Sequence, residues 1–545
     1  METLKDDEIV AFLSDFDDEA SDDGDPDFEP ELLQRNISED DMDTDVELSK
    51  EIEIPLEQNN YFCKDGNIKW TTIPPNGREL LRATNENVIH ERTGVTAYAV
   101  QRISEIRDSF DLCITTTMKK EIIRYSNMQG NAVYENFHCM DEIEFDAYLG
   151  LLMLIGVYRS YGESISCLWN ENHGRPLLRA VMTLERFTII SRVLAFDNRQ
   201  ARRSQVRGHK LAPIRSFYEK WTKNLQVLYV PNENITVDEQ LIPFRGRCPF
   251  KVYMPSKPGK YGMKAWIAAD SATAFCLQFQ IYLGKTSDLP ERNQGERVVL
   301  DLVSQYTGRN VTTDNFFTSH NLAQELLKRK ITLVGTVRKN KRFLPVHCTV
   351  KELRKLPIYT SKFFFHEKET IVQYVPKRYK IVTLLSGVDT MDQMVRTYSC
   401  KRKTNRWPVA LFSNLIDISA LNAFILWTEI NPNWQSRKLC KRRIFLQELG
   451  ESLVQPCILQ RNHMPRSEAS AALVRNVQHE YETPSMSLEP PPKILRSSER
   501  KRCQLCPSKQ EKKTHTKCNV CHKFVCPTHR ETKTITTTFC IDHKQ

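Results

Sequence analysis

The sequence predicts a multidomain α+β protein: a mixed β-sheet with helices lies between helical regions, and a cysteine-rich module follows at the C-terminal end. At 545 residues the chain is too long for one hydrophobic core and fits two to four domains. The hydrophobic period changes from helical spacing before residue 231 to strand alternation after it. Six of the 16 cysteines fall within residues 503–545.

The charge is distributed unevenly along the chain. Residues 1–50 contain 20 acidic and 3 basic residues, a net charge of −17, whereas the whole chain carries +9. The remaining 495 residues therefore carry +26, which favours a polyanionic partner such as nucleic acid. Residues 1–57 are predicted to be a disordered acidic tail that competes for the same basic surface. The alternative is a solubilising tail on an ordinary basic protein.

The sequence gives no sign of secretion or membrane insertion. The N-terminus is acidic and lacks the apolar region of a signal peptide. The longest apolar run, YLGLLMLIGVY at 148–158, has 11 residues, so we expect a buried helix and no membrane partner. Cysteines in such a chain are expected to be reduced thiols or metal ligands.

Helical spacing dominates residues 80–230. In AYAVQRISEIRDSFDLC, Val100, Ile103 and Ile106 recur at helical intervals, which predicts one helix. EFDAYLGLLMLIGVYRS and LERFTIISRVLAF are predicted to be buried helices.

Residues 231–338 follow an alternating order of strands and helices. Strands are expected at 234–244, 264–270, 273–283, 309–317 and 331–337, and helices at 295–308 and 319–330. The order β-β-β-α-β-α-β is that of an RNase H-like core, whose active site takes acids from the first strand, the end of the fourth strand and a late helix. Asp238, Asp314 and Asp389 occupy those three places.

Acids converging from rigid elements suit metal-assisted phosphodiester cleavage. Two Mg²⁺ ions about 4 Å apart activate the attacking oxygen and stabilise the leaving oxygen, and Mg²⁺ prefers oxygen ligands. Each acid also has a simpler interpretation as a turn former or helix cap. Asp389 fits an N-cap, and Asp392 fits an ion pair with Arg396, on a helix with Val388, Met391 and Val395 along its apolar face.

Several longer motifs indicate a family. ITVDEQLIPFRGRCPFKVYMPSKPGKYGMKAW, VTTDNFFTSHNLAQELLKRKITLVGTVRKNKR, GVDTMDQM and RKTNRWPVALF closely resemble the piggyBac family of DNA transposases, including domesticated piggyBac-derived proteins. The resemblance covers roughly residues 80–440 and the cysteine-rich tail. It implies that Asp238, Asp314 and Asp389 are a catalytic triad holding two Mg²⁺ or Mn²⁺ ions, with Asp392 as an accessory acid.

The resemblance also implies a reaction and its partners. Family members bind terminal inverted repeats in double-stranded DNA, nick the 3′ ends, form hairpins and join the ends at TTAA targets. They act as homodimers, through helical segments on both sides of the catalytic core. In RKTNRWP, basic side chains beside a tryptophan could bind DNA phosphates. The alternative is that these residues form a solvated basic loop before a helix that begins at Pro408, because such a loop has the same composition. The expected DNA-binding residues are Lys401, Arg402, Lys403, Arg406 and Trp407.

One segment is shorter than the family pattern. After FFFHEKETIVQYVPKRYKIVTLLS the chain runs directly into GVDTMDQM, so that Asp314 and Asp389 are only 75 residues apart. Either the lost part is a dispensable loop, or its loss displaces Asp389 and leaves a DNA-binding protein without cleavage activity. A shift of about 1 Å at a catalytic group can cost about a hundredfold in rate.

The C-terminal tail has the spacing of a zinc module. CQLC, CNVC, CPTH and CIDH are separated by 11, 4 and 10 residues and supply eight ligands, enough for two tetrahedral Zn²⁺ ions. Interleaved pairing would give one ion Cys503, Cys506, Cys526 and His529, and the other Cys518, Cys521, Cys540 and His543. A module this short needs the metal for its folding energy. The piggyBac tail is similar and binds terminal repeats; a RING ligase or histone-reading role is the alternative.

These observations predict a transposase that binds and cuts DNA in the nucleus. One alternative is a transposase-derived DNA-binding protein that no longer cuts. The other is a zinc-containing protein-interaction adaptor, and the net charge of +26 outside the acidic tail argues against it. Lys493, Arg496, Arg500, Lys501 and Arg502 fit a nuclear localisation signal. The expected regions are an acidic tail (1–57), a helical dimerisation and DNA-binding region (80–230), the first part of the RNase H-like core (231–338), a shortened β insertion (339–386), the helix carrying the third acid (387–399), the second part of the helical region (400–460), a linker (461–502) and the two-zinc module (503–545).

Overall fold

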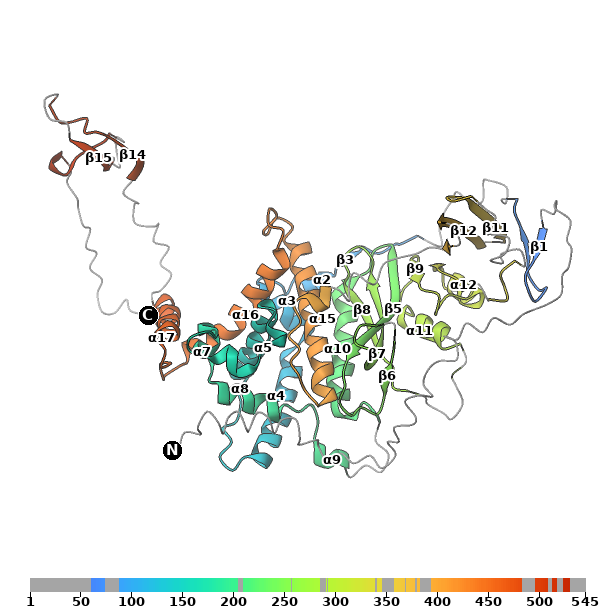
Figure 1. Ribbon diagram of the computed structural model, residues 1–545, viewed down its shortest axis with the longest axis horizontal. Coiled ribbons are helices and arrows are strands. Elements are labelled where there is room, and N and C mark those ends of the chain that lie inside the picture. Colours follow the sequence, from blue (N-terminus) through green and yellow to red (C-terminus); the bar gives the residue numbers. More distant parts are fainter. Residues whose placement is uncertain are drawn as a thin grey trace. The chain divides into compact units, whose positions relative to one another are not determined.

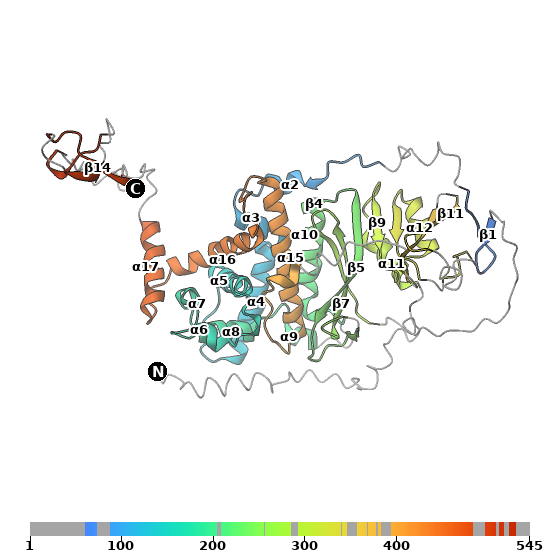
Figure 2. The same cartoon turned by 45° about the horizontal axis from the view of Figure 1, so that its top comes forward.

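The structure is a computed structural model, and its chain separates into two compact units, Met1–Arg475 and Asn476–Gln545. It describes residues 60–73, 88–203, 209–255, 257–284, 291, 293–338, 341–345, 357–367, 369–377, 380–382, 394–482, 496–507, 512–516 and 523–529. The larger unit combines helices with two larger β-sheets and a two-stranded sheet of β3 (Gly94–Val95) and β4 (Tyr229–Val230), and Figures 1 and 2 show it in two orientations.

The helical part of the larger unit is built from two distant stretches of the chain. Its helices are α2 (Ala97–Val100), α3 (Ile106–Cys113), α4 (Thr116–Val133), α5 (Glu142–Val157), α6 (Ile165–Trp169), α7 (Pro176–Val181), α8 (Leu184–Val193), α9 (Arg199–Arg203), α10 (Arg215–Leu228), α15 (Trp407–Ile430) and α16 (Lys441–Leu459). The expected buried helix is α5, in which every residue from Phe145 to Val157 is buried. Asp141 begins it by accepting a hydrogen bond from the Glu144 amide at 2.8 Å.

Helices α5 and α16 cross at a pair of glycines. A Cβ atom on Gly150 would lie 2.8 Å from the Gly450 carbonyl oxygen, and one on Gly450 would lie 2.8 Å from Leu154. The clash with the carbonyl oxygen could be relieved only by moving the α16 backbone, so Gly150 is needed for the helices to pack this closely; a side chain at Gly450 would force Leu154 to shift. This crossing ties the C-terminal helical stretch to the N-terminal one.

Helix α15 is the central helix of this unit. Among the described residues it alone has the length and apolar composition to cross a bilayer, but it is buried along nearly all of its length inside the protein. Its Ser419 accepts a hydrogen bond from Trp221 of α10, and its Asn422 bonds both backbone groups of Cys276 in the neighbouring sheet. In Figures 1 and 2, α10 and α15 lie between that sheet and the other helices.

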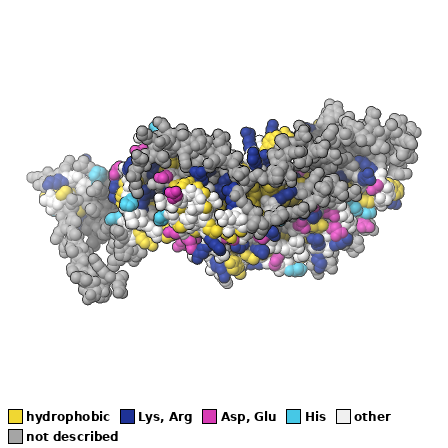
Figure 3. All heavy atoms as spheres, turned by 90° about the horizontal axis from the view of Figure 1, so that it is seen from below, with side chains coloured by type: hydrophobic (Ala, Val, Ile, Leu, Met, Phe, Trp, Pro, Cys, Tyr) yellow, Lys and Arg dark blue, Asp and Glu magenta, His cyan; other side chains and the backbone are white. Residues whose placement is uncertain are grey.

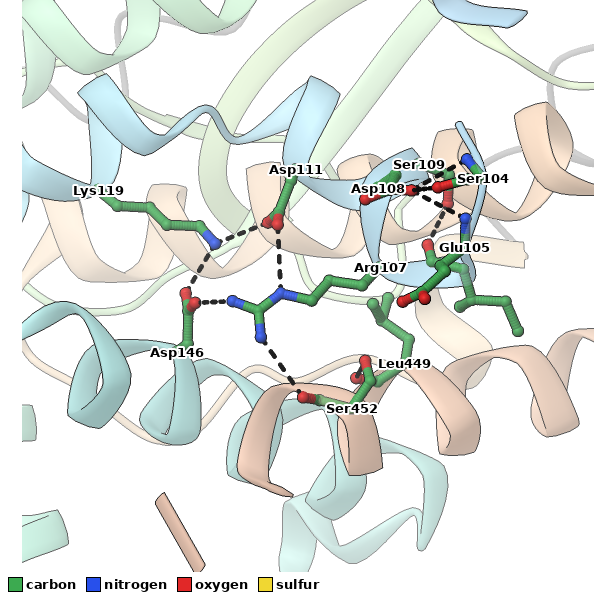
Figure 4. Close-up of polar contacts among 11 residues, drawn as sticks. Ser104, Glu105, Arg107, Asp108, Ser109, Asp111, Lys119, Asp146, Leu449 and Ser452 are labelled. Carbon is green, nitrogen blue, oxygen red and sulfur yellow. Dashed lines mark hydrogen bonds and ion pairs between the residues drawn. The ribbon is translucent and has the colours of Figure 1, made fainter. Parts of the chain in front are cut away.

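The predicted helix through Val100, Ile103 and Ile106 is wrong: the chain breaks between α2 and α3. Val100 is 47% exposed rather than part of the apolar face. Asp108 accepts hydrogen bonds from the amides of Ser104 (2.9 Å) and Glu105 (2.8 Å), which forms a capping box and starts a new helix. Figure 4 shows this cap.

A buried ionic network joins three of the helices (Figure 4). Asp146 of α5 lies 2.7 Å from Lys119 of α4 and also pairs with Arg107 of α3. Asp111 of α3 contacts the same two cations. The Lys119 side chain is only 4% exposed, so its charge depends on these carboxylates.

We expect Asp146→Ala to destabilise the larger unit by about 3 kcal/mol, because it removes one partner of a buried charge. The matched control is Glu219→Ala, which breaks the pair with Arg215, whose partners are 51% and 50% exposed; it should cost less than about 1 kcal/mol. Urea unfolding followed by tryptophan fluorescence gives both values. Equal losses in the two variants would contradict a structural role for the network.

The larger sheet is mixed and matches the strand pattern expected from residue 231 onward. Its strands are β5 (Asn234–Pro243), β6 (Lys251–Tyr253), β7 (Tyr261–Asp270), β8 (Cys276–Ile281), β9 (Asn310–Thr313) and β10 (Thr332–Gly335). The order is β10-β9-β5-β7-β6, with β8 also paired to β7. Strands β5, β9 and β10 are mutually parallel; α11 (Gln294–Leu302) leads from β8 to β9, and α12 (His320–Lys328) connects β9 with β10. Only the short β6 was not expected.

The smaller sheet extends the predicted β insertion with strands from the N-terminal part of the chain. It contains β1 (Asn60–Phe62), β2 (Lys69–Thr71), β11 (Ser361–His366), β12 (Glu369–Lys377) and β13 (Lys380–Val382), in that order. Strand β2 pairs with β11 at Thr71 and Phe365. Its core contains Cys63, Trp70, Leu344, Phe364 and Ile371. An insertion made from 339–386 alone is therefore an incomplete description.

The second unit contains a two-stranded antiparallel sheet of β14 (Arg496–Arg502) and β15 (Lys513–Thr516). Helix α17 (Glu468–Glu482) runs across the boundary between the units. The range 461–502, expected to be a linker, thus holds a helix and a strand. Part of the expected nuclear localisation signal, from Arg496 to Arg502, lies in β14.

Candidate active site and metal centre

Two of the three predicted catalytic acids meet beside neighbouring parallel strands. Asp238 lies on β5, and Asp314 directly follows the last residue of β9. The two strands pair up to Val237 and Thr313, so the acids occupy equivalent positions just beyond the shared ladder. The Asp314 carboxylate accepts a hydrogen bond from the Phe316 amide at 2.9 Å, which fixes the turn after β9.

A tight turn after β9 fixes the backbone at Asp314. Thr318 donates a hydrogen bond from its hydroxyl to the Asp314 carbonyl oxygen at 2.7 Å. The hydroxyls of Thr313 and Thr318 lie 2.8 Å apart, and a Cβ atom on Gly335 would come within 2.7 Å of both. Glycine at this position in β10 lets that strand approach the turn closely.

Glu239 is a third acid at this site that the sequence reasoning missed. Carboxylate oxygens of Asp238, Glu239 and Asp314 all lie within 4.8 Å of one another, a spacing that could hold a divalent cation. Successive residues of a strand normally point to opposite faces, so alternation argued against using both Asp238 and Glu239. The feature of the sequence that could have indicated Glu239 is its position directly after Asp238 in VDEQ.

Burial, together with crowding of negative charge, raises the pKa values of the two predicted acids. Burial, followed by repulsion from Glu239 and Asp314, raises the pKa of Asp238 to about 7. Burial and repulsion from Glu239 also raise the pKa of Asp314. A divalent cation would relieve this repulsion, so the donor set fits a metal that takes oxygen ligands.

Without added divalent cations, the free energy of unfolding should decrease as the pH rises, because of Asp238. Its folded-state pKa of about 7 lies above the unfolded value, so the folded protein binds the extra proton between about pH 4 and 7. Across this window the free energy of unfolding of the wild type should decrease by up to about 1.4 kcal/mol per pH unit, relative to that of Asp238→Asn. Urea unfolding at pH 5 and pH 8 measures the difference. The control is Asp301→Asn, because Asp301 forms an exposed ion pair with Arg297. If the stability of Asp238→Asn and of the wild type responds identically to pH, the raised pKa of Asp238 is contradicted.

Two lysines face the acidic cluster. Lys264 of β7 is largely buried, and burial lowers its pKa while Glu239, Asp314 and Asp238 partly offset that effect. Its ammonium lies 4.8 Å from the centre of the Phe316 ring, which follows Asp314 closely in the chain. Lys257 lies 3.8 Å from the Glu239 carboxylate. These cations leave the cluster less negative than its three carboxylates alone would make it.

The remaining predicted acids, Asp389 and Asp392, lie outside the described residues. The chain is described again from Met394, and residues 394–397 are helical. Val395 is buried, as its place on the predicted apolar face requires. Arg442 donates a hydrogen bond to the Met394 carbonyl, and Asp417 of α15 accepts from the Cys400 amide at 2.8 Å. This end of the segment is therefore fixed to the helical part.

The residues predicted to bind DNA connect the helical part to the larger sheet. Lys401 donates to the Pro243 carbonyl at the end of β5, and Arg402 donates to the carbonyls of Ser160 and Glu163 at 2.5 Å. Arg406 donates to the Arg192 carbonyl at 2.8 Å and to that of Leu194. The Trp407 ring packs against Phe250 with 4.9 Å between centres, and Lys403 is exposed.

These contacts give the segment a structural role that composition alone did not indicate. Contact of these side chains with DNA stays a prediction. On the face drawn in Figure 3, Lys and Arg side chains are spread along the described part of the molecule, with Asp and Glu among them.

The second unit brings together one of the two predicted zinc-ligand sets. Cys503, Cys506, Cys526 and His529 place their ligand atoms within 4.8 Å of one another. The Cys506 and Cys526 sulfurs are 3.7 Å apart, and His529 Nδ1 lies 3.8, 3.5 and 3.4 Å from the three sulfurs. Ligands at the bond lengths typical of zinc sit about 3.5–3.8 Å apart in a tetrahedron. The other set, Cys518, Cys521, Cys540 and His543, lies outside the described residues.

Comparisons with known proteins point to one family. The family model described as Transposase IS4 matches residues 107–386 and 379–424. Over 229 residues the chain is 29% identical to the human PiggyBac transposable element-derived protein 3 and to the human Chimeric ERCC6-PGBD3 protein. Each match covers 40% of this chain, but only 37% and 21% of those proteins.

A solved structure matches over a greater length. The cryo-EM structure of a piggyBac transposase synaptic complex with hairpin DNA is similar with a TM-score of 0.66 and 30% sequence identity. The match covers 80% of this chain and 98% of that chain. The likeness therefore extends over nearly the whole of the solved protein.

Proposed function

Because this chain belongs to the piggyBac family of transposases, we propose that it binds DNA ends and cuts and joins them at TTAA sequences by metal-dependent phosphodiester chemistry. The observation that carries this proposal is the convergence of Asp238 and Asp314 just beyond paired parallel strands, with Glu239 beside them. The strand order β10-β9-β5-β7 with β8 on β7 supports an RNase H-like core.

The proposed catalytic residues are Asp238, Asp314 and Asp389, with Asp392 as an accessory acid. The first two, with Glu239, offer the oxygen ligands that Mg²⁺ or Mn²⁺ requires. Two such ions would activate the attacking oxygen and stabilise the leaving oxygen at each phosphate. The protein's own part is to hold the carboxylates on rigid strands and to keep Lys264 near them, where its charge would also attract a phosphate.

The proposed partner is double-stranded DNA bearing terminal inverted repeats. Its 3′ ends would be nicked, the freed hydroxyls would attack the opposite strand to give hairpins, and the ends would join at TTAA. The solved relative is a synaptic complex with hairpin DNA, which supports this partner. The helical regions 80–230 and 400–460 would bind DNA and form a homodimer. Lys401, Arg402, Lys403, Arg406 and Trp407 would contribute from the segment that joins them to the sheet.

The C-terminal module would hold two Zn²⁺ ions and bind the terminal repeats. The tetrahedral spacing of Cys503, Cys506, Cys526 and His529 supports the first ion. Nuclear localisation follows from the DNA substrate and from the basic run ending at Arg502.

A nicking assay tests the proposed activity. Labelled duplexes carrying candidate terminal repeats next to TTAA are incubated with the full chain and Mg²⁺ or Mn²⁺, beside duplexes with a scrambled TTAA. We expect metal-dependent nicks at the 3′ ends of the repeats. DNA binding without nicking under either metal, together with cutting by a version whose shortened segment is restored from a relative, would overturn the proposal in favour of a DNA-binding protein that no longer cuts.

A further inference from the structure

Lys264 is a basic residue beside the acidic cluster, and the strand register fixes its place. Strand β7 pairs with β5 so that Trp266 lies opposite Glu239, and Lys264 lies opposite Leu241. Alternate residues of a strand share a face, so the side chains of Lys264 and Trp266 leave the sheet on the same side as that of Glu239. Lys264 and Glu239 are then diagonal neighbours, a separation that long side chains can span.

Two aromatic rings lie beside the ammonium group of Lys264. Its Nζ atom is 4.8 Å from the centre of the Phe316 ring and 5.6 Å from the centre of the Trp266 ring. The faces of aromatic rings attract cations. Phe316 is itself fixed at the acidic cluster, because its amide donates to the Asp314 carboxylate at 2.9 Å. The rings therefore keep a positive charge close to the acids.

No described residue accepts a hydrogen bond from the ammonium group of Lys264. Among the described residues, its Nζ atom has no carboxylate oxygen within 4.0 Å, although Glu239 and Asp314 both act on its charge. Lys257 differs, because its Nζ donates to the Glu239 carbonyl oxygen at 3.3 Å and lies 3.8 Å from the Glu239 carboxylate. Half-buried donors in proteins normally have partners. The N–H groups of Lys264 are therefore suited to an acceptor on a bound ligand.

We propose that Lys264 is a further catalytic residue, whose ammonium group binds a non-bridging oxygen of the phosphate that is cut. This inference rests on the proposed function. During cleavage the oxygen of the attacking water bonds to phosphorus, the bond from phosphorus to the leaving 3′ oxygen breaks, and the proton that the water loses is matched by one that the leaving oxygen gains. Negative charge develops around phosphorus as this happens. The Lys264 ammonium keeps its own proton and stabilises that charge.

The aromatic rings explain why a lysine can act here beside metal ligands. A lysine paired with Asp238 or Asp314 would compete with a metal ion for the carboxylate, and its own charge would be neutralised. Lys264 lies against Phe316 and Trp266 instead. It therefore leaves the carboxylates to the metal and keeps its N–H groups for the phosphate.

Single-turnover nicking by the full chain tests this role against simple charge balance. At saturating Mn²⁺, Lys264→Met should slow the nicking of a repeat-bearing duplex about a hundredfold, as expected for the loss of one group that stabilises transition-state charge. Lys264→Arg keeps the charge and should recover most of the rate. If Lys264 only balances the charge of the acids, Lys264→Met should instead bind Mn²⁺ more tightly and cut at the wild-type rate once the metal saturates, which would overturn the proposal.

The matched control is Lys328→Met. Lys328 lies on α12, its side chain is 69% exposed, and it forms an ion pair with Glu325. This variant should nick the duplex at the wild-type rate. A loss in Lys328→Met equal to that in Lys264→Met would also overturn the proposal, because it would show a general effect of removing a lysine.

A second measurement does not depend on cutting. Reductive methylation of the full chain in Ca²⁺, followed by mass spectrometry, reports the accessibility of the Lys264 amine. A duplex with an ordinary phosphate at the cleavage position, supplied about tenfold above its dissociation constant, should slow methylation of Lys264 about tenfold. A duplex with a neutral methylphosphonate at that position should not, and Lys328 should react equally with both.

The two measurements separate the contact from the cleavage activity. Equal methylation of Lys264 with the two duplexes would overturn the proposal, whatever the nicking rate. Protection that requires the charged phosphate, in a chain that nicks no DNA with either Mg²⁺ or Mn²⁺, would support the phosphate contact while rejecting the proposed cleavage activity.

Discussion

Asp314→Asn should reduce metal-dependent DNA nicking at least about a hundredfold while leaving DNA binding and folding intact. The side chain keeps its size and can still accept the Phe316 amide hydrogen bond, so the turn after β9 should persist. What it loses is one negative charge at the centre of a cluster whose carboxylates lie within 4.8 Å of one another. Misplacing or losing a charged ligand at a phosphoryl-transfer site typically costs a factor of this size or more.

The measurement is single-turnover nicking of a repeat-bearing duplex in Mg²⁺ and Mn²⁺, with affinity for the same duplex measured in parallel. Asp301→Asn is the matched control, because Asp301 is 51% exposed on α11 and pairs only with its neighbour Arg297 among the described residues. It should cut at the wild-type rate. Nicking by Asp314→Asn within about threefold of wild type would remove Asp314 from the reaction.

Glu239→Gln distinguishes a third ligand from a bystander. If Glu239 contributes a metal ligand, the variant should need more Mn²⁺ for half-maximal nicking, with a smaller effect at saturating metal. If it acts only through repulsion, its removal should lower the metal concentration needed at acidic pH, because Asp238 would ionise more readily.

Cys526→Ser should release one zinc ion per chain and unfold its part of the second unit. The four ligands surround one point at tetrahedral spacing, and the small sheet of β14 and β15 offers little apolar core to replace them. Structural zinc sites contribute on the order of 10 kcal/mol to the folding of such small modules, so the loss of one ligand is expected to be decisive.

Zinc content by elemental analysis should fall from two ions to one, and the amides of 512–516 should lose their exchange protection. Cys167→Ser is the matched control, since Cys167 is an exposed free cysteine in the larger unit. It should keep both ions. Full zinc content in Cys526→Ser would show that this cluster is not a metal site.

The sequence predicted that Asp238 and Asp314 lie close together, because strand alternation and chain order are local signals. Asp238 lies within the first readable strand and Asp314 directly follows the fourth, and the parallel pairing of β5 with β9 brings these two positions together. Their catalytic role stays a prediction. The clustering of Cys503, Cys506, Cys526 and His529 was likewise readable, because their spacing along the chain is that of zinc ligands. Zinc binding itself stays a prediction. These features depend on few residues and on fixed geometry.

What the sequence did not reveal depends on contacts between distant segments. Lys401, Arg402 and Arg406 look like phosphate ligands by composition, yet in the fold they donate to carbonyls of residues more than 150 positions away. Val100 matched a helical period, but a local cap at Asp108 overrode it. Strand β2 pairs with β11, a distant partner that no local pattern identifies.

That last pairing has a consequence for how the protein is made. Thr71 and its partner Phe365 are 294 residues apart, so at about 5–20 residues per second the ribosome needs roughly 15–60 s to supply the partner strand. Until then Trp70, which ends buried in the smaller sheet, has no core to enter. Contacts of such long sequence separation form slowly. During synthesis the segment around Trp70 is therefore one place where we expect a chaperone to bind.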